Sequence, residues 1–185
     1  MHFRLTRWGF VTYSVNTWCK VVESGKQWEG VITVFRGINA INIDPKGRMT
    51  VPTRYRELLE INCQGRLILT IDTDERCLLL YGMPEWEAIE KQVAALPSFN
   101  KASRRVQRLL IGYATEVELD SNGRILLPTL LREYAGINKH VMMIGQGKKF
   151  ELWDDAQWNA RRESWLTEEP EDGDVLPVGM QNISL

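Results

Sequence analysis

The chain of 185 residues has few of the side chains that metal and thiol chemistry require. It contains only two histidines, and its three cysteines, Cys19, Cys63 and Cys77, include no Cys-x-x-Cys pair. Structural zinc sites and redox pairs are built from clustered cysteine and histidine ligands. No nucleophile, base and orienting group can be placed together either. The sequence therefore predicts a protein that is not an enzyme and holds no metal or other cofactor.

Long apolar runs are also absent. No stretch approaches the roughly eighteen apolar residues of a membrane-spanning helix, and the N-terminal segment lacks the apolar centre of a secretory signal. Unpaired cysteines are typical of a reducing compartment. We expect a cytoplasmic protein with no membrane partner and no small-molecule substrate.

A net charge close to zero hides an uneven distribution. The formal charge of the whole chain is -1. Residues 34–162 hold 19 Lys and Arg against 16 Asp and Glu, whereas residues 163–185 hold six acids and no base. Such an end segment is typical of a solvated extension, and we expect an acidic, disordered tail over residues 167–185. The tail masks a basic core.

The most informative feature is a phrase that occurs twice. Asp44-Pro-Lys-Gly-Arg-Met-Thr-Val-Pro52 is followed 76 residues later by Asp120-Ser-Asn-Gly-Arg-Ile-Leu-Leu-Pro128, so both copies read Asp-x-x-Gly-Arg-x-x-x-Pro. In both copies the chain continues from this proline as Pro-Thr-x-x-Arg-Glu. Repetition of this kind indicates two copies of one supersecondary unit, each too small to bury its apolar face alone.

The phrase predicts two short strands joined by a tight turn and followed by a helix. Asp44 and Asp120 supply acceptors for N–H groups of the turn, and Gly47 and Gly123 supply its positive φ. The Pro-Thr pair then opens a helix. Its predicted apolar face is Tyr55, Leu58 and Leu59 in the first copy and Leu130, Leu131 and Tyr134 in the second.

Arg48 and Arg124 stand just past the two predicted turns. The apolar alternation of a strand gives no reason for a cation there. A single exposed arginine is an ordinary surface residue, but the same arginine at the same place in both copies favours a role in recognition.

The repeated phrase resembles the AbrB-like swapped-hairpin DNA-binding element. Two copies, opened by Phe35-Arg36-Gly37 and separated by Arg104-Arg105-Val-Gln-Arg108-Leu-Leu-Ile-Gly112, resemble the MraZ family of bacterial transcription regulators, encoded at the head of the division and cell-wall gene cluster. The resemblance implies an α+β fold of two tandem AbrB-like swapped-hairpin β units with short helices, related by a pseudo-two-fold axis, in a ring-shaped homo-oligomer. The predicted segments are a first repeat over 34–96, a linking helix over 97–114 and a second repeat over 115–166.

The resemblance also implies a function. It predicts a sequence-specific, nucleoid-associated repressor that binds double-stranded DNA at short direct repeats upstream of its own gene. By this resemblance Arg48 and Arg124 contact DNA, and a guanidinium suits guanine in the major groove. We expect Lys46 and Arg36 to contact phosphates, which fixes register without reading sequence.

Two other functions fit the same residues. An AbrB-like antitoxin would use the acidic tail to wrap a toxin, and a ring-forming scaffold would not bind DNA. A further basic stripe on the linking helix favours neither, because such a stripe is as often a solvated face or a subunit contact. It consists of Lys101, Arg104, Arg105 and Arg108.

Residues 1–33 depart from the family, whose members begin at the motif that here starts at Val34. Trp8, Trp18 and Trp28 are spaced ten residues apart without helix or strand periodicity. Tryptophan has the single codon TGG, so the spacing places TGG triplets at intervals of whole turns of B-DNA. We interpret the segment as a translated operator and leader, with Val34 as the native start; a genuine N-terminal arm is the alternative.

Deleting residues 1–33 should leave oligomer size, solubility and DNA binding unchanged, because no core-forming period occurs in the segment. Gel filtration and gel-shift assays of the shortened and complete chains check this. Loss of the oligomer would show that the segment is structural.

Overall fold

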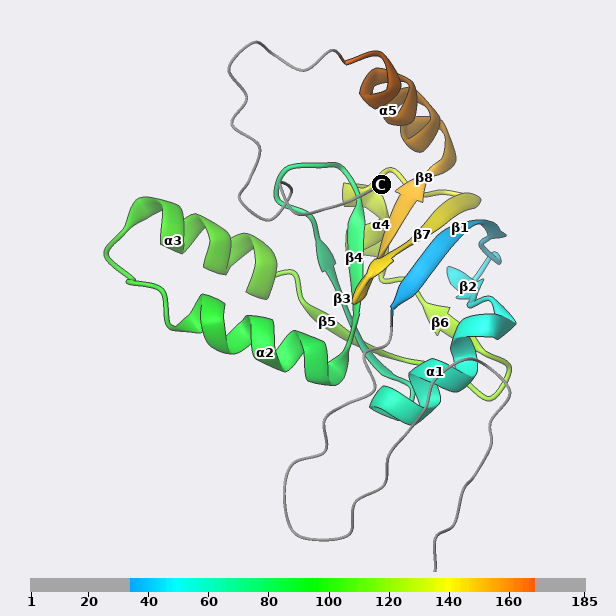
Figure 1. The fold of residues 1–185 in the computed structure, drawn as a ribbon, viewed down its shortest axis with the longest axis horizontal. Helices are drawn as coiled ribbons and strands as arrows, with labels where there is room; N and C mark the ends of the chain where they lie inside the picture. The colour runs from blue at the N-terminus through cyan, green and yellow to red at the C-terminus, as the bar shows by residue number, and fades with distance from the viewer. Residues whose placement is uncertain (1–33, 169–185) are drawn as a thin grey trace, which may run out of the picture. The chain divides into compact units, whose positions relative to one another are not determined.

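The computed structural model describes residues 34–168 (Figure 1). The predicted leader over 1–33 and nearly all of the predicted disordered tail lie outside the described residues. The elements in chain order are β1 (Phe35–Asn42), β2 (Arg48–Thr50), α1 (Thr53–Cys63), β3 (Arg66–Ile71), β4 (Leu78–Gly82), α2 (Met83–Ala94), α3 (Lys101–Val106), a π-helical turn η1 (Gln107–Ile111), β5 (Thr115–Glu118), β6 (Arg124–Leu126), α4 (Thr129–Tyr134), β7 (His140–Gly147), β8 (Lys149–Asp154) and α5 (Asp155–Thr167).

The main sheet combines strands from both repeats. Its order is β1-β7-β8-β4-β3-β5, and its neighbouring strands are antiparallel. The two repeats occupy equivalent places in this order. β1 of the first repeat lies beside the β7–β8 hairpin of the second, and β5 of the second repeat lies beside the β3–β4 hairpin of the first. Mixed helices and antiparallel strands confirm the predicted α+β class. Neither repeat completes the sheet by itself.

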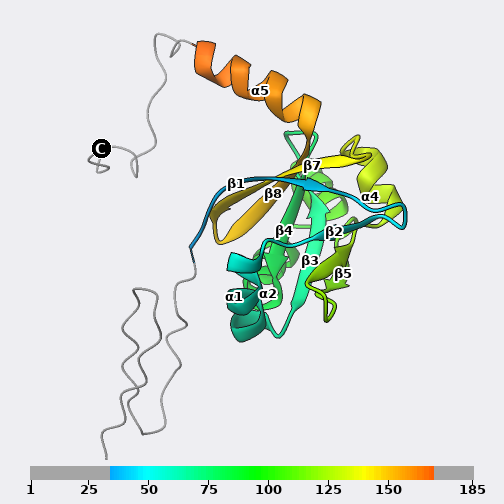
Figure 2. The same cartoon turned by 90° about the vertical axis from the view of Figure 1, so that its right-hand side faces the viewer.

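A separate two-stranded ribbon joins the repeats a second time. β2 pairs with β6, and Met49 lies opposite Ile125, its own equivalent in the other repeat. Both side chains are fully buried, at 0% and 1% exposure. The two β2–β6 strands run side by side at the right of Figure 1, and Figure 2 shows β1 leading into β2 at one end of the unit.

The predicted local hairpins are correct only at their turns. Between β1 and β2 the structure forms a single bridge, Ile43 with Met49, and the longer partner of β1 is β7. The amide of Asp44 donates to the carbonyl of Arg48, and the amide of Gly47 donates to that of Asp44, which closes the predicted turn. The strands beyond each turn therefore pair with the other repeat.

The two helices begin where the sequence predicts, at Thr53 and Thr129. Tyr55, Leu59 and Leu131 are buried in the main core as expected. Leu130 is 64% exposed, so its predicted place on the apolar face of α4 is wrong. This helix has only six residues, and it contacts the core along a narrow strip.

α5 covers part of the other face of the sheet. The side chain of Asp154 caps its first turn by accepting from two backbone amides. Trp153 of β8 packs edge-to-face against Trp158 and Trp165 of α5, with ring centroids 5.8 Å apart in each case. Such aromatic pairs add to the free energy gained from the buried area itself. α5 is thereby fixed to the sheet by its tryptophans.

Of the segment predicted as a linking helix, residues 101–111 are helical, as α3 and η1. The side chain of Asn100 accepts from the amides of Ala102 and Ser103 and so caps α3. α2 and α3 project together at the left of Figure 1, on the opposite side of the view from β2 and β6. Among residues 34–168, no helix has the length and apolar character needed to cross a membrane.

Each repeat locks the turn of the other. The carbonyl of Gly123 accepts from the amide of Val51, and the carbonyl of Gly47 accepts from the amide of Leu127. The guanidinium of Arg132 lies over Gly47, where an added Cβ would come within 3.3 Å of three of its atoms. Arg56 lies over Gly123 in the same way. Both glycines have positive φ, 82° and 72°.

Gly123→Ala should destabilise the fold more than Gly147→Ala. Both glycines have nearly the same φ, 72° and 71°, so both alanines bear a left-handed strain of about 1–2 kcal/mol. A Cβ on Gly123 would also overlap Arg56, whereas a Cβ on Gly147 meets nothing within 4 Å. Urea denaturation measures the difference. Equal losses of folding free energy in the two variants would show that Arg56 moves aside without destabilising the fold.

Candidate nucleic-acid interface

The first predicted turn is organised by one carboxylate. Oδ1 of Asp44 accepts from the amides of Lys46 and Arg48, at 2.9 and 3.0 Å. Oδ2 accepts from Nε and Nη2 of the Arg48 side chain, at 2.8 and 2.6 Å. Asp44 thus closes the turn with one oxygen and holds the arginine with the other.

The second turn repeats this geometry closely. Oδ1 of Asp120 accepts from the amides of Asn122 and Arg124, each at 2.9 Å. Oδ2 accepts from Nε and Nη2 of Arg124, at 2.8 and 2.7 Å. The amide of Gly123 closes the turn by donating to the carbonyl of Asp120 at 2.8 Å. Two distant segments therefore place a guanidinium in the same orientation.

The ion pairs explain why an arginine occurs at each of these strand positions, which the strand periodicity did not. The side chains of Arg48 and Arg124 are 30% and 29% exposed, so they are neither buried nor freely solvated. In each guanidinium, Nε and one hydrogen of Nη2 face the carboxylate. The outer edge, formed by Nη1 and the second hydrogen of Nη2, remains available to a ligand.

The same contacts shift the pKa values of the carboxyl groups. The backbone amide and then the guanidinium of Arg48 lower the pKa of Asp44 to about 2. The Arg124 guanidinium lowers the pKa of Asp120. Asp120, and to a smaller extent the charge of Asp44, raise the pKa of Arg124. Because the field of Asp44 reaches Arg124, the two motifs form one charge cluster.

The β2–β6 ribbon places both arginines on its outward face. Arg48 lies opposite Leu126, and Thr50 lies opposite Arg124. Side chains alternate along a strand, so these four share one face while Met49 and Ile125 point into the core. Diagonal neighbours on such a ribbon lie about 7–8 Å apart. Arg48 and Arg124 therefore stand together on a small surface.

Lys46 and Arg36, the other two residues predicted to contact DNA, lie far apart. Lys46 is exposed in the first turn, two residues from Arg48. Arg36 is exposed near the start of β1, opposite Gln146, whereas the turn follows the last residues of that strand. Along a strand this separation is about 20 Å. The structure brings Lys46 to the arginine pair and leaves Arg36 apart from it.

Arg56 and Arg132 are site residues that the sequence prediction missed. Nε of Arg56 donates to the carbonyl of Val51 at 2.7 Å, and Nε of Arg132 donates to that of Leu127 at 3.1 Å. Both guanidinium groups support a turn of the other repeat. The signal was present, because the repeated Pro-Thr-x-x-Arg-Glu contains these arginines at equivalent positions. Their role required knowledge of the long-range packing.

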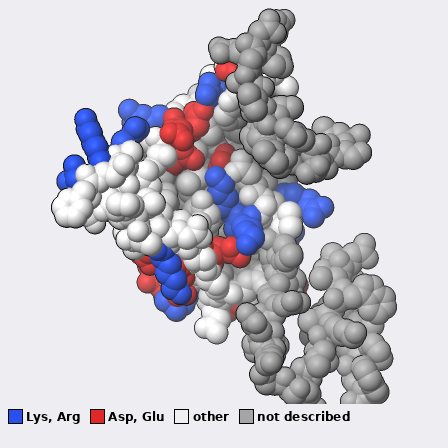
Figure 3. Space-filling view, turned by 60° about the vertical axis from the view of Figure 1, so that its left-hand side comes forward, with Lys and Arg blue, Asp and Glu red and all other residues white. Residues whose placement is uncertain are grey.

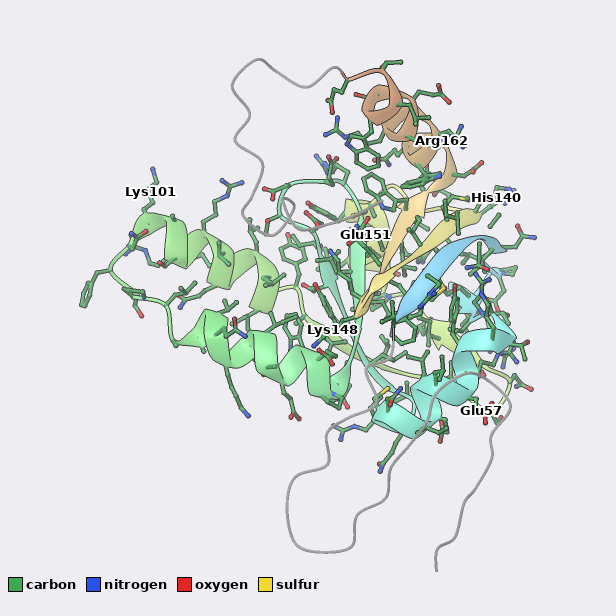
Figure 4. All side chains as sticks on the ribbon, viewed as in Figure 1. Glu57, Lys101, His140, Lys148, Glu151 and Arg162 are labelled. Atoms are coloured by element: carbon green, nitrogen blue, oxygen red, sulfur yellow. The ribbon has the colours of Figure 1, made fainter. Side chains whose placement is uncertain are left out.

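The basic stripe of the linking segment belongs to another surface. Figure 4 labels Lys101 at the outer end of α3, across the view from α1, where Glu57 is labelled. Arg104 is engaged with the carbonyls of Ser98 and Phe99 rather than turned toward a ligand. On the face that brings α2 and α3 forward, lysine and arginine side chains alternate with acidic ones (Figure 3). This pattern favours an ordinary solvated face.

The interface offers charge and hydrogen bonds. Over residues 34–168, no three His, Cys, Asp or Glu side chains are grouped to hold a metal ion. Two outward guanidinium edges at fixed spacing can recognise paired acceptors on a rigid partner.

Comparison with known proteins agrees with the duplicated architecture. A family model described as MraZ protein, antitoxin-like, matches residues 34–109 and again residues 110–172. The two matches together cover more than half of the chain, and each contains one Asp-x-x-Gly-Arg turn. The chain belongs to the MraZ family. The resemblance drawn from the repeated phrase is confirmed.

Similar MraZ proteins come from several bacteria. A protein named transcriptional regulator MraZ from Coxiella burnetii (strain Dugway 5J108-111) is 58% identical over 152 residues, which is 82% of this chain and 100% of the relative. Proteins of the same name from Legionella pneumophila (strain Corby) and Halorhodospira halophila are 57% and 47% identical, with the same coverage. None of these relatives carries the name of an enzyme.

The contribution of Asp44 to stability should disappear in acid. Its pKa is about 2 in the folded chain and about 3.9 in an unfolded one. The ionised carboxylate therefore stabilises the fold above about pH 4, and that contribution is lost as the pH falls to about 2. Asp44→Asn keeps an acceptor oxygen but does not titrate. The stability gap between wild type and Asp44→Asn, measured by urea denaturation, should be constant from pH 7 to 5 and narrow between pH 4 and 2. A constant gap would contradict the pairing with Arg48.

Proposed function

We propose that this MraZ-family chain is a sequence-specific DNA-binding regulator of transcription that reads guanine with Arg48 and Arg124. The observation that carries the proposal is the outward ribbon face, where each arginine is held by its own aspartate and presents its outer edge. Guanine offers O6 and N7 side by side in the major groove, which matches two N–H groups of one guanidinium. The relatives' name, transcriptional regulator, supports the same function.

The shape of the site fits the major groove. A two-stranded β-ribbon is one of the elements that this groove admits. The spacing of about 7–8 Å between Arg48 and Arg124 corresponds to about two base-pair steps of about 3.4 Å. Both arginines of one chain would then reach bases within a single short box.

The preorganised carboxylates also explain how acidic groups tolerate a DNA partner. Asp44 and Asp120 each lie within 2.7 Å of their own arginine, so their charges are paired before DNA arrives. Lys46, which is exposed in the first turn, adds a positive charge beside them that is suited to a phosphate of the same box. Arg36, at the far end of β1, is suited to a phosphate outside that box.

The proposed oligomer follows from the small size of one ribbon. One ribbon presents few contacts, and avidity over several boxes would supply the affinity. We propose a ring-shaped homo-oligomer of swapped-hairpin units, in which successive subunits meet short direct repeats upstream of the gene itself. The exchange of β1 and β5 between the repeats supports the swapped arrangement within one chain. Repression of its own promoter, at the head of the division and cell-wall gene cluster, is the expected outcome.

Arg48→Lys and Arg124→Lys should each weaken specific binding while keeping the net charge. Lysine lacks the planar fork that matches guanine and the aspartate together. Loss of one bidentate guanine contact corresponds to about 5- to 150-fold in affinity. The measurement is fluorescence anisotropy with a duplex carrying three TGG boxes ten base pairs apart, and a scrambled duplex reports non-specific binding, which should not change.

Arg105→Lys on α3 is the matched control, because it changes the same side chain away from the ribbon. It should bind like wild type. If folded Arg48→Lys and Arg124→Lys proteins also bind like wild type, these arginines are not the reading pair. If the wild-type chain binds neither duplex, nor DNA from upstream of its own gene, a ring-forming scaffold without a DNA role is the better proposal.

An antitoxin is the second candidate, because the family description is antitoxin-like. In that case the acidic segment from Glu163 onward, which holds six acids and no base, would wrap a basic toxin. A small toxin gene beside this one favours that function. A division and cell-wall gene cluster beside it favours the regulator.

A further inference from the structure

The two repeats differ on the outward ribbon face although they agree beneath it. The equivalent inward positions are apolar in both repeats: Met49 corresponds to Ile125, and Val51 corresponds to Leu127. At the outward position between them the first repeat has Thr50 and the second has Leu126. The pseudo-symmetric ribbon therefore presents a polar side chain beside one arginine and an apolar side chain beside the other.

Leu126 is poorly explained by the fold. It is 53% exposed, while its neighbours Ile125 and Leu127 are each only 1% exposed. Single exposed leucines are common on proteins, but this one lies on the surface that carries the arginine pair. It lies directly opposite Arg48 in the β2–β6 ladder. A ligand that the outer edge of Arg48 touches would therefore lie close to Leu126.

We propose that Leu126 reads thymine by contacting its C5-methyl group, next to the guanine read by Arg48. This rests on the DNA-binding function proposed above. Thymine is the base that presents a methyl group in the major groove. Residues directly opposite in an antiparallel pair lie about 4.5–5.5 Å apart, which is comparable to the step of about 3.4 Å between base pairs. Adjacent base pairs are thus within reach of the two side chains.

The difference between the repeats gives the site a direction. With identical side chains in both repeats, a pseudo-two-fold ribbon would favour a palindromic box. Thr50, which lies opposite Arg124, carries a hydroxyl that suits a donor or an acceptor on a base. Leu126 offers only apolar contact. The box is therefore asymmetric, and a series of such boxes is read best when all of them point the same way.

Deoxyuridine substitution tests the contact, because uracil lacks only the methyl group of thymine. The complete chain is titrated with the three-box TGG duplex, in which the thymine of every box is replaced by uracil, and affinity is measured by fluorescence anisotropy at fixed salt. Wild type should lose about fourfold for each engaged box, the equivalent of one methyl-sized group no longer buried. Leu126→Ser and Leu126→Asn, whose side chains offer no apolar group to the methyl of thymine, should bind both duplexes equally.

Thr50→Ala is the matched control at the equivalent position, and it should keep the preference for thymine. Because Leu126 is exposed, its variants should fold, and thermal melting verifies this. A second duplex carries 7-deazaguanine in place of guanine, which removes the N7 acceptor. If wild type is weakened by 7-deazaguanine but not by uracil, the role of Leu126 is wrong and guanine reading stands. If Leu126→Ser retains the thymine preference, the contact belongs to another residue and the proposal is overturned. If neither base change alters binding, guanine reading and thymine reading both fail.

Discussion

The structure depends on the mutual closure of its two turns. The carbonyl of each turn glycine, Gly47 and Gly123, accepts from a backbone amide of the other repeat, and an arginine of that repeat lies over the glycine. A side chain at either glycine would oppose both the positive φ and this arginine. Because the contacts are reciprocal, loss of one turn removes contacts from the other. The sheet order, in which each repeat's first strand pairs with the other repeat, is the same dependence on a larger scale.

This closure gives each aspartate two tasks that must agree. Asp44 closes the backbone with one oxygen and aims Arg48 with the other. The guanidinium cannot rotate without losing its partner, so its outer edge has one direction before any ligand binds. Preorganisation of this kind reduces the entropy lost on binding. The low pKa of Asp44 keeps the pair charged throughout the physiological range.

Local features of this chain were predictable, and long-range pairing was not. The turns, the starts of α1 and α4 and the cap at Asn100 follow from residue chemistry within a few positions. The apolar alternation of β1 is the same whichever strand it pairs with, so its pairing with β7 could not be read from periodicity. The exposure of Leu130 has the same origin, because the narrow contact of α4 is decided by the sheet beneath it. The repetition predicted the arginine pair, whereas the ion pairs with Asp44 and Asp120 depend on the folded geometry of the turns.

The closure constrains the two faces of the β2–β6 ribbon unequally. Inward residues must fill a shared core, and both repeats accordingly place apolar side chains there, as with Met49 and Ile125. Outward residues bear no such constraint, and there the repeats differ, as with Thr50 and Leu126. A duplicated unit can in this way keep a nearly symmetric framework while its binding face becomes asymmetric. The arginines are the exception, since their carboxylate partners belong to the turns, and this is why charge is symmetric on the outward face while the side chains beside it are not.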